Sequence, residues 1–390
     1  MKYLIALCLL FPTFIHAQYL RGRVVDVANG QSLPQASVFV SKTSIGTVAD
    51  NSGNFSLAKL PSGSFELVIS YIGYETTVLR FEKARDSVLL VQLNVKDKKL
   101  EDIIVQSYEK NGWERWGFLF KNNFIGISSY ADECRILNVN DIGFIFSEKK
   151  QILNAYARNP IIIINKKLGY KIQFQLEEFT YNMKTDHLFY SGYPSFMELD
   201  GNRKAKKRWA TERRKVYEGS FMMFAKRLNQ NKLQESGFVV RKLVREPNKE
   251  KQRVKFKVDY FVDINQLSHD SLAYYNRIMN QSDYTDFLYK DTLSFDQFAF
   301  RTDSNGVQLK FNNYLYITYP SNKKNEPIFQ FRREVSSGGL LTSIITLQDK
   351  TPITIYDSGA FYDPANITFM GYWAWSEKVG MILPLDYQPE

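Results

Sequence analysis

Residues 46–75 read GTVADNSGNFSLAKLPSGSFELVISYIGYE, and this stretch decides the fold of the first part of the chain. The cluster at 50–53 predicts a tight turn, because Asp and Asn side chains bond the nearby backbone and Gly accepts a positive φ. After it, Phe55 and Leu57 alternate with polar residues, which indicates a half-buried strand. A second alternating run follows the turn predicted at 61–63. The stretch therefore predicts short strands joined by tight turns.

The same pattern extends to both sides of this stretch. Strands are predicted at 19–27 and 36–40 before it, and at 76–81 and 87–93 after it. Short strands with turn signals about every 8–12 residues are typical of a sandwich. Residues 18–100 are therefore predicted to form a small β-sandwich.

Several motifs of this region match a known family. RGRVVDVANGQSLPQASVFVSKTSIGTVADNSGNFSL, SYIGYE and the closing VLLVQL resemble the carboxypeptidase-regulatory-like domain. That domain is a transthyretin-like β-sandwich common in exported Bacteroidetes proteins. The resemblance implies an accessory docking or spacer module, not the peptidase itself.

Residue types argue against a zinc carboxypeptidase. Such an enzyme needs two His and one Glu around an open coordination position. After residue 17 the chain has only His187 and His269, and neither begins an H-x-x-E pair. We therefore expect no carboxypeptidase activity.

The first 17 residues predict a secretory signal peptide. Lys2 precedes an apolar run at 3–15, and Ala17 supplies a small residue before the cut. No later stretch has 18 uninterrupted apolar residues, so no transmembrane helix is expected. The chain is thus predicted to be exported to the periplasm or the outer membrane. Cys134 is the one cysteine left after cleavage, and we interpret it as a small buried residue, since a nucleophile would need a nearby base.

Charge divides the rest of the chain. The net charge is +3 over 18–100, +11 over 101–260 and −5 over 261–390. We predict a basic α+β region at 101–260 and a β-rich region at 261–390, which is either separate or one domain with 101–260. The whole chain is then mainly β with helices, in the α+β class.

Two helices stand out in the basic region. Residues 108–124 place Trp113, Trp116, Phe120 and Phe124 on one face, which predicts a core-facing helix, with docking onto a partner as the alternative. A second helix is predicted at 203–228, and a third within 268–289.

The helix predicted at 203–228 is the principal candidate site. Its first half carries eight cations, opposed there only by Glu212: Arg203, Lys204, Lys206, Lys207, Arg208, Arg213, Arg214 and Lys215. Such self-repulsion favours an anion-binding face, and an ordinary solvated surface is the alternative. An exported protein rarely meets nucleic acid. The expected partner is therefore an anionic envelope component or an acidic protein surface.

Two further hypotheses concern glycan binding and hydrolysis. Tyr372, Trp373 and Trp375 suggest a sugar-stacking platform, in which Trp373 and Trp375 would share one face of a strand, with a buried aromatic corner as the alternative. A hydrolase would need two carboxylates about 5–10 Å apart, and the candidates are Glu133, Glu177 and Asp363. No phosphate loop, nucleophile elbow or metal-ligand cluster appears, so we expect a non-enzymatic protein without cofactor or metal.

The later part of the chain also resembles a known group. The runs FIGISSYADECRILN, NKKLGYKIQFQLEEF, SGYPSFMEL, KKRWATERRKVYEGSFMMF and GYWAWSEKVGMILPLDY are similar to those of an uncharacterised Bacteroidetes group. Its members carry the regulatory-like domain in front. This resemblance implies no particular activity or site residues.

Overall fold

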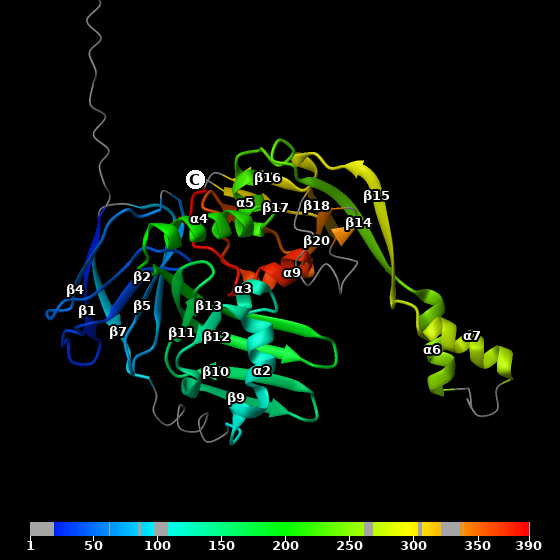
Figure 1. The fold of residues 1–390 in the computed structure, drawn as a ribbon, viewed down its shortest axis with the longest axis horizontal. Helices are drawn as coiled ribbons and strands as arrows, with labels where there is room; N and C mark the ends of the chain where they lie inside the picture. Colours follow the sequence, from blue (N-terminus) through cyan, green and yellow to red (C-terminus); the bar gives the residue numbers. More distant parts are fainter. Residues whose placement is uncertain are drawn as a thin grey trace, which may run out of the picture. The chain divides into compact units, whose positions relative to one another are not determined.

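The computed structural model (Figure 1) describes residues 19–61, 63–84, 87–96, 108–260, 268–302, 306–320, 336–337 and 339–389. The predicted signal peptide lies outside these residues. The chain divides into two compact units, Met1–Glu101 and Asp102–Glu390. It is mainly β with helices, as the sequence predicts.

The first unit consists of two sheets. Its strands are β1 (Leu20–Asp26), β2 (Ser37–Val40), β3 (Gly46–Val48), β4 (Asn54–Leu57), β5 (Phe65–Ser70), β6 (Thr77–Phe81) and β7 (Ser87–Leu93). One sheet has the order β4-β1-β7 and the other β3-β2-β5-β6. Alternate residues of both sheets, among them Leu20, Phe55 and Leu67, form one hydrophobic core. The predicted sandwich strands are thus confirmed.

The turn at 50–53 forms as its residue types predict. Asp50 Oδ1 accepts hydrogen bonds from the backbone N–H groups of Ser52 and Asn54, both at 2.8 Å. Gly53 has a φ of +78°, which only glycine adopts without strain. The turn therefore leads directly into β4, in which Phe55 faces the core.

A polar contact joins two of the motifs that carry the family resemblance. The Tyr74 hydroxyl, from SYIGYE, donates a 2.7 Å hydrogen bond to Asp26 Oδ2 at the end of β1. The Ala28 N–H donates to Asp26 Oδ1 at 2.7 Å. Together they hold the pKa of Asp26 below its usual value. The contact fastens the end of β1 to the turn after β5.

The second unit begins with a helix-covered sheet. Its elements are α2 (Gly112–Phe124), α3 (Ser129–Asp132), β8 (Cys134–Ile136), η1 (Val139–Asp141), β9 (Ile142–Ser147), β10 (Ile152–Ala157), β11 (Ile161–Asn165), β12 (Tyr170–Asn182) and β13 (His187–Glu198). The order is β8-β11-β12-β10-β9, with β13 paired to β12. Phe120 of α2 lies 5.7 Å from the Phe144 ring, and Phe124 lies 4.9 Å from Phe174, between centroids. The core-facing prediction for this helix is confirmed.

Two further sheets complete this unit. The remaining elements are α4 (Arg203–Tyr217), α5 (Phe221–Asn229), β14 (Val239–Pro247), α6 (Lys249–Tyr260), α7 (His269–Met279), β15 (Tyr284–Thr292), η3 (Phe295–Gln297), β16 (Ala299–Thr302), β17 (Gly306–Leu309), β18 (Tyr314–Pro320), β19 (Ser336–Ser337), β20 (Leu340–Leu347), η5 (Gln348–Lys350), β21 (Ile353–Tyr356), η6 (Pro364–Asn366), β22 (Ile367–Gly371) and α9 (Tyr372–Ser376). One sheet runs β15-β14-β18-β20-β19 with β22 on β20, and the other runs β16-β17-β21.

Strands β14 and β15 continue beyond their sheet. Pairing of β14 with β18 stops at Leu243, whereas pairing with β15 continues to Pro247 and Tyr284. The resulting two-stranded ribbon carries α6 and α7 at its end (Figure 1). The helix predicted within 268–289 is confirmed as α7, and the chain from Tyr284 onward joins the ribbon.

The single helix predicted at 203–228 is wrong in one respect. The chain forms two helices, α4 and α5, with a break at Gly219, whose φ of +76° is left-handed. Ser220 then caps α5, its hydroxyl accepting from the Met223 N–H at 3.1 Å. The Gly219 carbonyl accepts a 2.9 Å bond from Trp373 Nε1. Glycine and serine are favoured at a helix end and a helix start, so the local signal was present.

Within the described part of the chain, no helix has the length and apolar character needed to cross a membrane.

Candidate functional site

Helix α4 is anchored along one side. Asn202 caps it, with Oδ1 accepting a 2.9 Å bond from the Ala205 N–H. Trp209, Val216 and Tyr217 are buried on its inner side. The Trp209 indole N–H also donates to the Lys166 carbonyl at 3.0 Å. These contacts fix the rotation of the helix and therefore the direction of its opposite face.

The opposite face is almost wholly cationic. The helical period of 3.6 residues places positions 203, 204, 207, 208, 211, 214 and 215 on the outward side. All of these are Lys or Arg except Thr211. The predicted cations that are exposed are Arg203, Lys204, Lys206, Lys207, Arg208, Arg214 and Lys215. We call the first five, at the N-terminal half of α4, the cationic patch.

The cationic patch lacks the neutralisation seen further along the helix. Arg214 Nε lies 3.3 Å from Glu218 Oε1, and Lys215 Nζ lies 2.7 Å from Glu212 Oε1. Among the residues that the structure describes, no ion pair is found for any member of the patch. The first turn of α4 also contains no acidic residue. Cations at a helix N-terminus oppose the helix dipole, so this arrangement costs stability.

Glu212 is the one acid in the first half of the predicted helix, and its contacts are internal. Burial would raise the pKa of its carboxyl, but hydrogen bonds from the Lys215 ammonium and the Tyr130 hydroxyl outweigh that effect. The pKa of Glu212 is consequently lowered. The Glu212 carboxylate accepts hydrogen bonds from Lys215 Nζ at 2.7 Å and from the Tyr130 hydroxyl at 3.0 Å. It is therefore not available to neutralise the patch.

Arg213 does not belong to the exposed face, which corrects the sequence prediction. Its Nε donates to the Leu168 carbonyl at 2.7 Å, and its Nη1 donates to Glu198 Oε1 at 2.8 Å. The guanidinium lies 3.9 Å from the centroid of the Tyr170 ring. Arg213 follows buried Trp209 by four residues, about one helical turn, and therefore shares its inward face. Arg213 thus fastens α4 to the sheet instead of meeting a partner.

Two cations beside α4 were missed by sequence reasoning. Lys166 and Lys167 lie in the turn between β11 and β12, and Lys166 is exposed. The Lys167 ammonium lies 5.4 Å from the Tyr130 ring centroid and contributes to the field at Glu212. Only the docking of Trp209 on this turn brings them near the helix. No local pattern in the sequence could have indicated it.

The aromatic residues near the C-terminus are structural. Tyr372, Trp373 and Trp375 lie in helix α9, not in a strand, because Gly371 with a φ of +69° turns the chain out of β22. Trp373 is only 1% exposed, and its ring lies 5.1 Å from that of Phe224. Tyr372 and Trp375 are buried as well. The buried-corner alternative therefore describes these rings, and they offer no open face to a sugar.

The remaining catalytic candidates are surface carboxylates. Glu133, Glu177 and Asp363 are exposed and lie on separate elements. In the described ranges, no group of three or more His, Cys, Asp or Glu side chains is arranged to hold a metal ion.

Cys134 is a free, buried cysteine, as the sequence predicts. Burial raises the pKa of its thiol to about 12, and Sγ donates a 3.3 Å hydrogen bond to the Tyr130 carbonyl. A protonated thiol is a poor nucleophile.

Comparison with known proteins identifies the first unit. Residues 20–105 match the CarboxypepD_reg-like domain, which confirms the resemblance seen in the sequence motifs. No curated protein matches the chain.

Solved structures show weaker likenesses. A type II cohesin–X-dockerin complex from Acetivibrio cellulolyticus is 16% identical over 19% of this chain and 52% of that chain, with a TM-score of 0.17. A putative carbohydrate binding protein from Bacteroides uniformis is 11% identical over 48% and 81%, also at 0.17. A putative membrane-associated protein of unknown function from Bacteroides fragilis is 9% identical over 90% and 94%, again at 0.17. Scores this low support no statement about the fold or function of this chain.

Proposed function

We propose that this chain, whose residues 20–105 match a carboxypeptidase-regulatory-like domain, is an exported, non-enzymatic cell-envelope protein that binds an anionic partner through the cationic patch of α4. The observation that carries the proposal is the concentration of exposed, unneutralised cations at a helix N-terminus. Natural helices usually place acids there. A departure from a local rule that costs stability points to a functional surface.

The chemistry of the patch defines its partner. Every residue from Arg203 to Arg208 is an exposed cation except Ala205, which is half-buried. The bound surface is therefore polyanionic, as in the acid groups of an envelope polysaccharide or an acidic protein face. Its attraction would be electrostatic and reversible by salt, because exposed charges are screened beyond about 8 Å at physiological ionic strength.

Fractionation of the native host is the first test. We expect the protein in the envelope fraction, and we expect washing with concentrated salt to release it. A protein that stays soluble in the periplasm at any ionic strength would contradict the proposal, and the cations would then serve solvation alone.

Charge-reversed variants supply the second test. Arg203→Glu, Lys204→Glu, Lys207→Glu and Arg208→Glu should together abolish envelope binding, because four of the five patch cations become repulsive to an anionic partner. Folding should survive, since acids at a helix N-terminus are favourable.

The matched control reverses four exposed lysines elsewhere in the second unit, with the same change in net charge: Lys110, Lys149, Lys150 and Lys310. This control should bind like the unmodified protein. Equal loss in both variants would mean that net charge, and not the patch, governs binding.

A further inference from the structure

The helical pair at the end of the β14–β15 ribbon buries very little of itself. In α6 only Val254 is buried, and in α7 only Ile278 is buried, among the residues described for the two helices. Strand β15 is likewise exposed along its whole length. Most of the surface of the pair therefore faces solvent.

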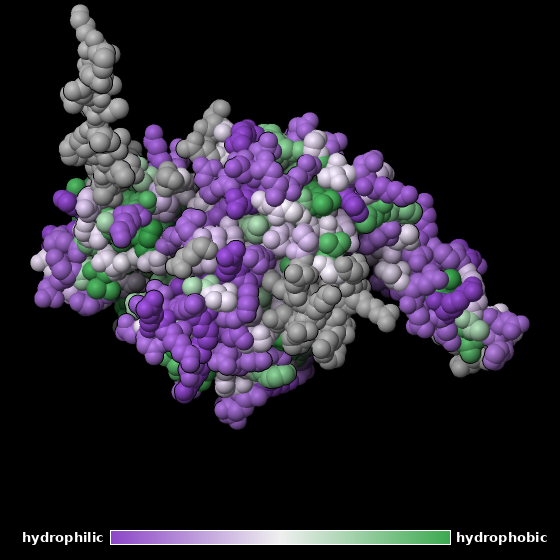
Figure 2. Space-filling view, turned by 45° about the horizontal axis from the view of Figure 1, so that its top comes forward, coloured by the Kyte–Doolittle hydropathy of each residue, from purple (hydrophilic) through white to green (hydrophobic). Residues whose placement is uncertain are grey.

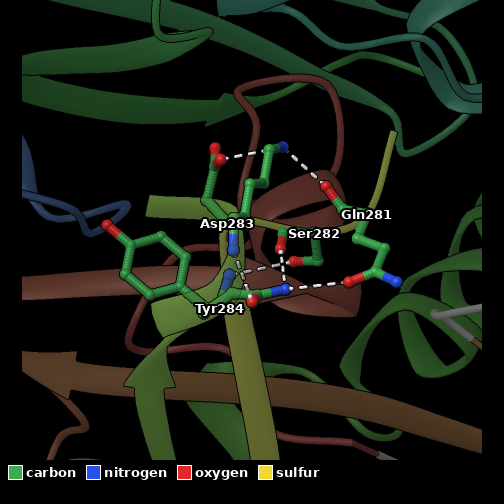
Figure 3. Close-up of polar contacts among 6 residues, drawn as sticks. Gln281, Ser282, Asp283 and Tyr284 are labelled. Carbon is green, nitrogen blue, oxygen red and sulfur yellow. Dashed lines mark hydrogen bonds and ion pairs between the residues drawn. The ribbon is translucent and has the colours of Figure 1, made fainter. Parts of the chain in front are cut away.

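Polar contacts nevertheless fix the pair firmly on the ribbon. Lys251 Nζ lies 2.9 Å from Asp283 Oδ1 and donates to the Gln281 carbonyl at 2.6 Å. Asn248 Nδ2 donates to the Ser282 carbonyl at 3.2 Å. Figure 3 shows these contacts converging where the chain returns from α7 into β15. Residues at the start of α6 are therefore bonded to the segment that leads from α7 into β15, and these bonds hold α6 against the ribbon.

A second cluster ties the two helices to each other. Arg253 Nε donates to Glu250 Oε2 at 2.8 Å, and the Tyr274 hydroxyl of α7 donates to Glu250 Oε1. These bonds hold the pKa of Glu250 at about 2. Glu250 and Asp283 are thus engaged internally, whereas Glu246 and Asp259 are exposed.

The outward face of α6 combines aromatic rings with cations. Phe256 is 57% exposed and Tyr260 is 72% exposed, and their ring centroids lie 5.2 Å apart. Positions 249, 253, 256, 257 and 260 share this face by the helical period. Lys249 and Lys257 therefore flank the rings. In Figure 2 hydrophobic groups appear between hydrophilic ones at the end of the molecule where α6 and α7 lie.

We propose that this face of α6 docks onto the surface of an anionic phospholipid bilayer. Aromatic rings lie at the level of the headgroups, and lysines next to them attract anionic lipid. This site is separate from the cationic patch of α4, which has no exposed ring, and it goes beyond the function proposed above.

The shape of the surface favours lipid over a protein partner. The two rings protrude from a convex helix, and a protein would need a rigid apolar pocket matched to their outline. A headgroup layer is fluid, accepts rings of any outline and presents a phosphate to each lysine. Basic helices that expose aromatic side chains are typical of peripheral membrane attachment.

A fluorescent probe tests the contact directly. The full chain carrying Cys8→Ser and Tyr260→Cys is labelled with an environment-sensitive dye, and buried Cys134 should not compete for the reagent. Vesicles of phosphatidylglycerol and phosphatidylcholine should shift the emission to the blue, whereas phosphatidylcholine alone should not.

The control places the dye at Phe118→Cys, a 79% exposed aromatic position on α2. No shift at position 260, or an equal shift at position 118, would overturn the proposal.

Vesicle sedimentation separates rings from charges. Phe256→Ser with Tyr260→Ser should weaken binding roughly tenfold, because burying two rings is worth more than 1.4 kcal/mol. Lys249→Gln with Lys257→Gln should weaken it similarly and reduce its salt dependence, without touching the core. Phe118→Ser should bind normally.

The charge-reversed α4 variant should keep the emission shift when dye is carried at position 260. That result would hold even if the α4 proposal failed, so the two can be judged apart. Undiminished vesicle binding by both α6 variants would show that this face of α6 does not bind the bilayer.

Discussion

Arg213 and Arg214 are neighbours in α4 but have opposite roles. Arg213 is buried, and its guanidinium donates to the carbonyls of Leu168 and Gly169 as well as to Glu198. Arg214 is largely exposed and makes only a surface pair with Glu218. The two residues have the same side chain, but the helical period turns Arg213 towards the sheet and Arg214 towards solvent.

Replacing each arginine should expose this difference. Arg213→Ala should lower the free energy of unfolding by about 2–4 kcal/mol, since it leaves the buried Leu168 carbonyl without this donor and removes the ion pair with Glu198. Arg214→Ala should cost less than about 1 kcal/mol, as for other surface ion pairs. Urea unfolding of both variants measures this. Similar losses would mean that Arg213 is not the anchor of α4.

At the scale of elements, helix α5 is fastened to the C-terminal segment by a buried lysine. Lys226 Nζ donates to the carbonyls of Leu385 and Tyr387 at 2.8 and 3.0 Å. Burial lowers the pKa of Lys226 from 10.5 to about 8, although Asp386 opposes the shift. The pKa of the Lys226 ammonium group is therefore lower in the folded chain than in the unfolded chain.

This predicts a pH dependence with a definite sign. Between pH 8 and 10.5 the unfolded chain binds more protons at Lys226 than the folded chain, so stability from this group rises with pH. Below pH 8 the lysine is charged in both states and the folded protein bears the cost of burying it. As the pH rises from 8 to 10.5, the free energy of unfolding of the unmodified protein should increase by about 1–3 kcal/mol relative to that of Lys226→Met. Urea unfolding of both proteins at several pH values measures the difference, and a constant difference would contradict it.

At the scale of the whole molecule, the chain has two separate hydrophobic cores. One is built from β1 to β7 around residues such as Phe55, and the other extends from α2 to the C-terminal segment around residues such as Phe224. The two sets share no residue. Each core belongs to one of the two compact units.

Two cores predict two unfolding transitions. Phe55→Ala should destabilise the first unit by about 3–5 kcal/mol and lower only one transition, because it empties a site in that core alone. Phe224→Ala should lower only the other. Calorimetry of the full chain and of both variants measures this. A single transition shifted by either change would show that the units unfold together.

The sequence by itself determined the features that depend on neighbours along the chain. Alternation and turn residues predicted the β-sandwich, since period 2 and the bonding of Asp50 act within a few residues. The 3.6-residue period predicted the core face of α2 and the crowding of cations on α4. The tertiary structure alone decided what depends on distant segments. It buried Arg213 and the α9 rings, brought Lys166 and Lys167 beside α4, and exposed Phe256 and Tyr260 on α6. Burial depends on which surfaces meet, and these surfaces come from residues far apart in the chain, such as Trp373 and Gly219, which are 154 positions apart.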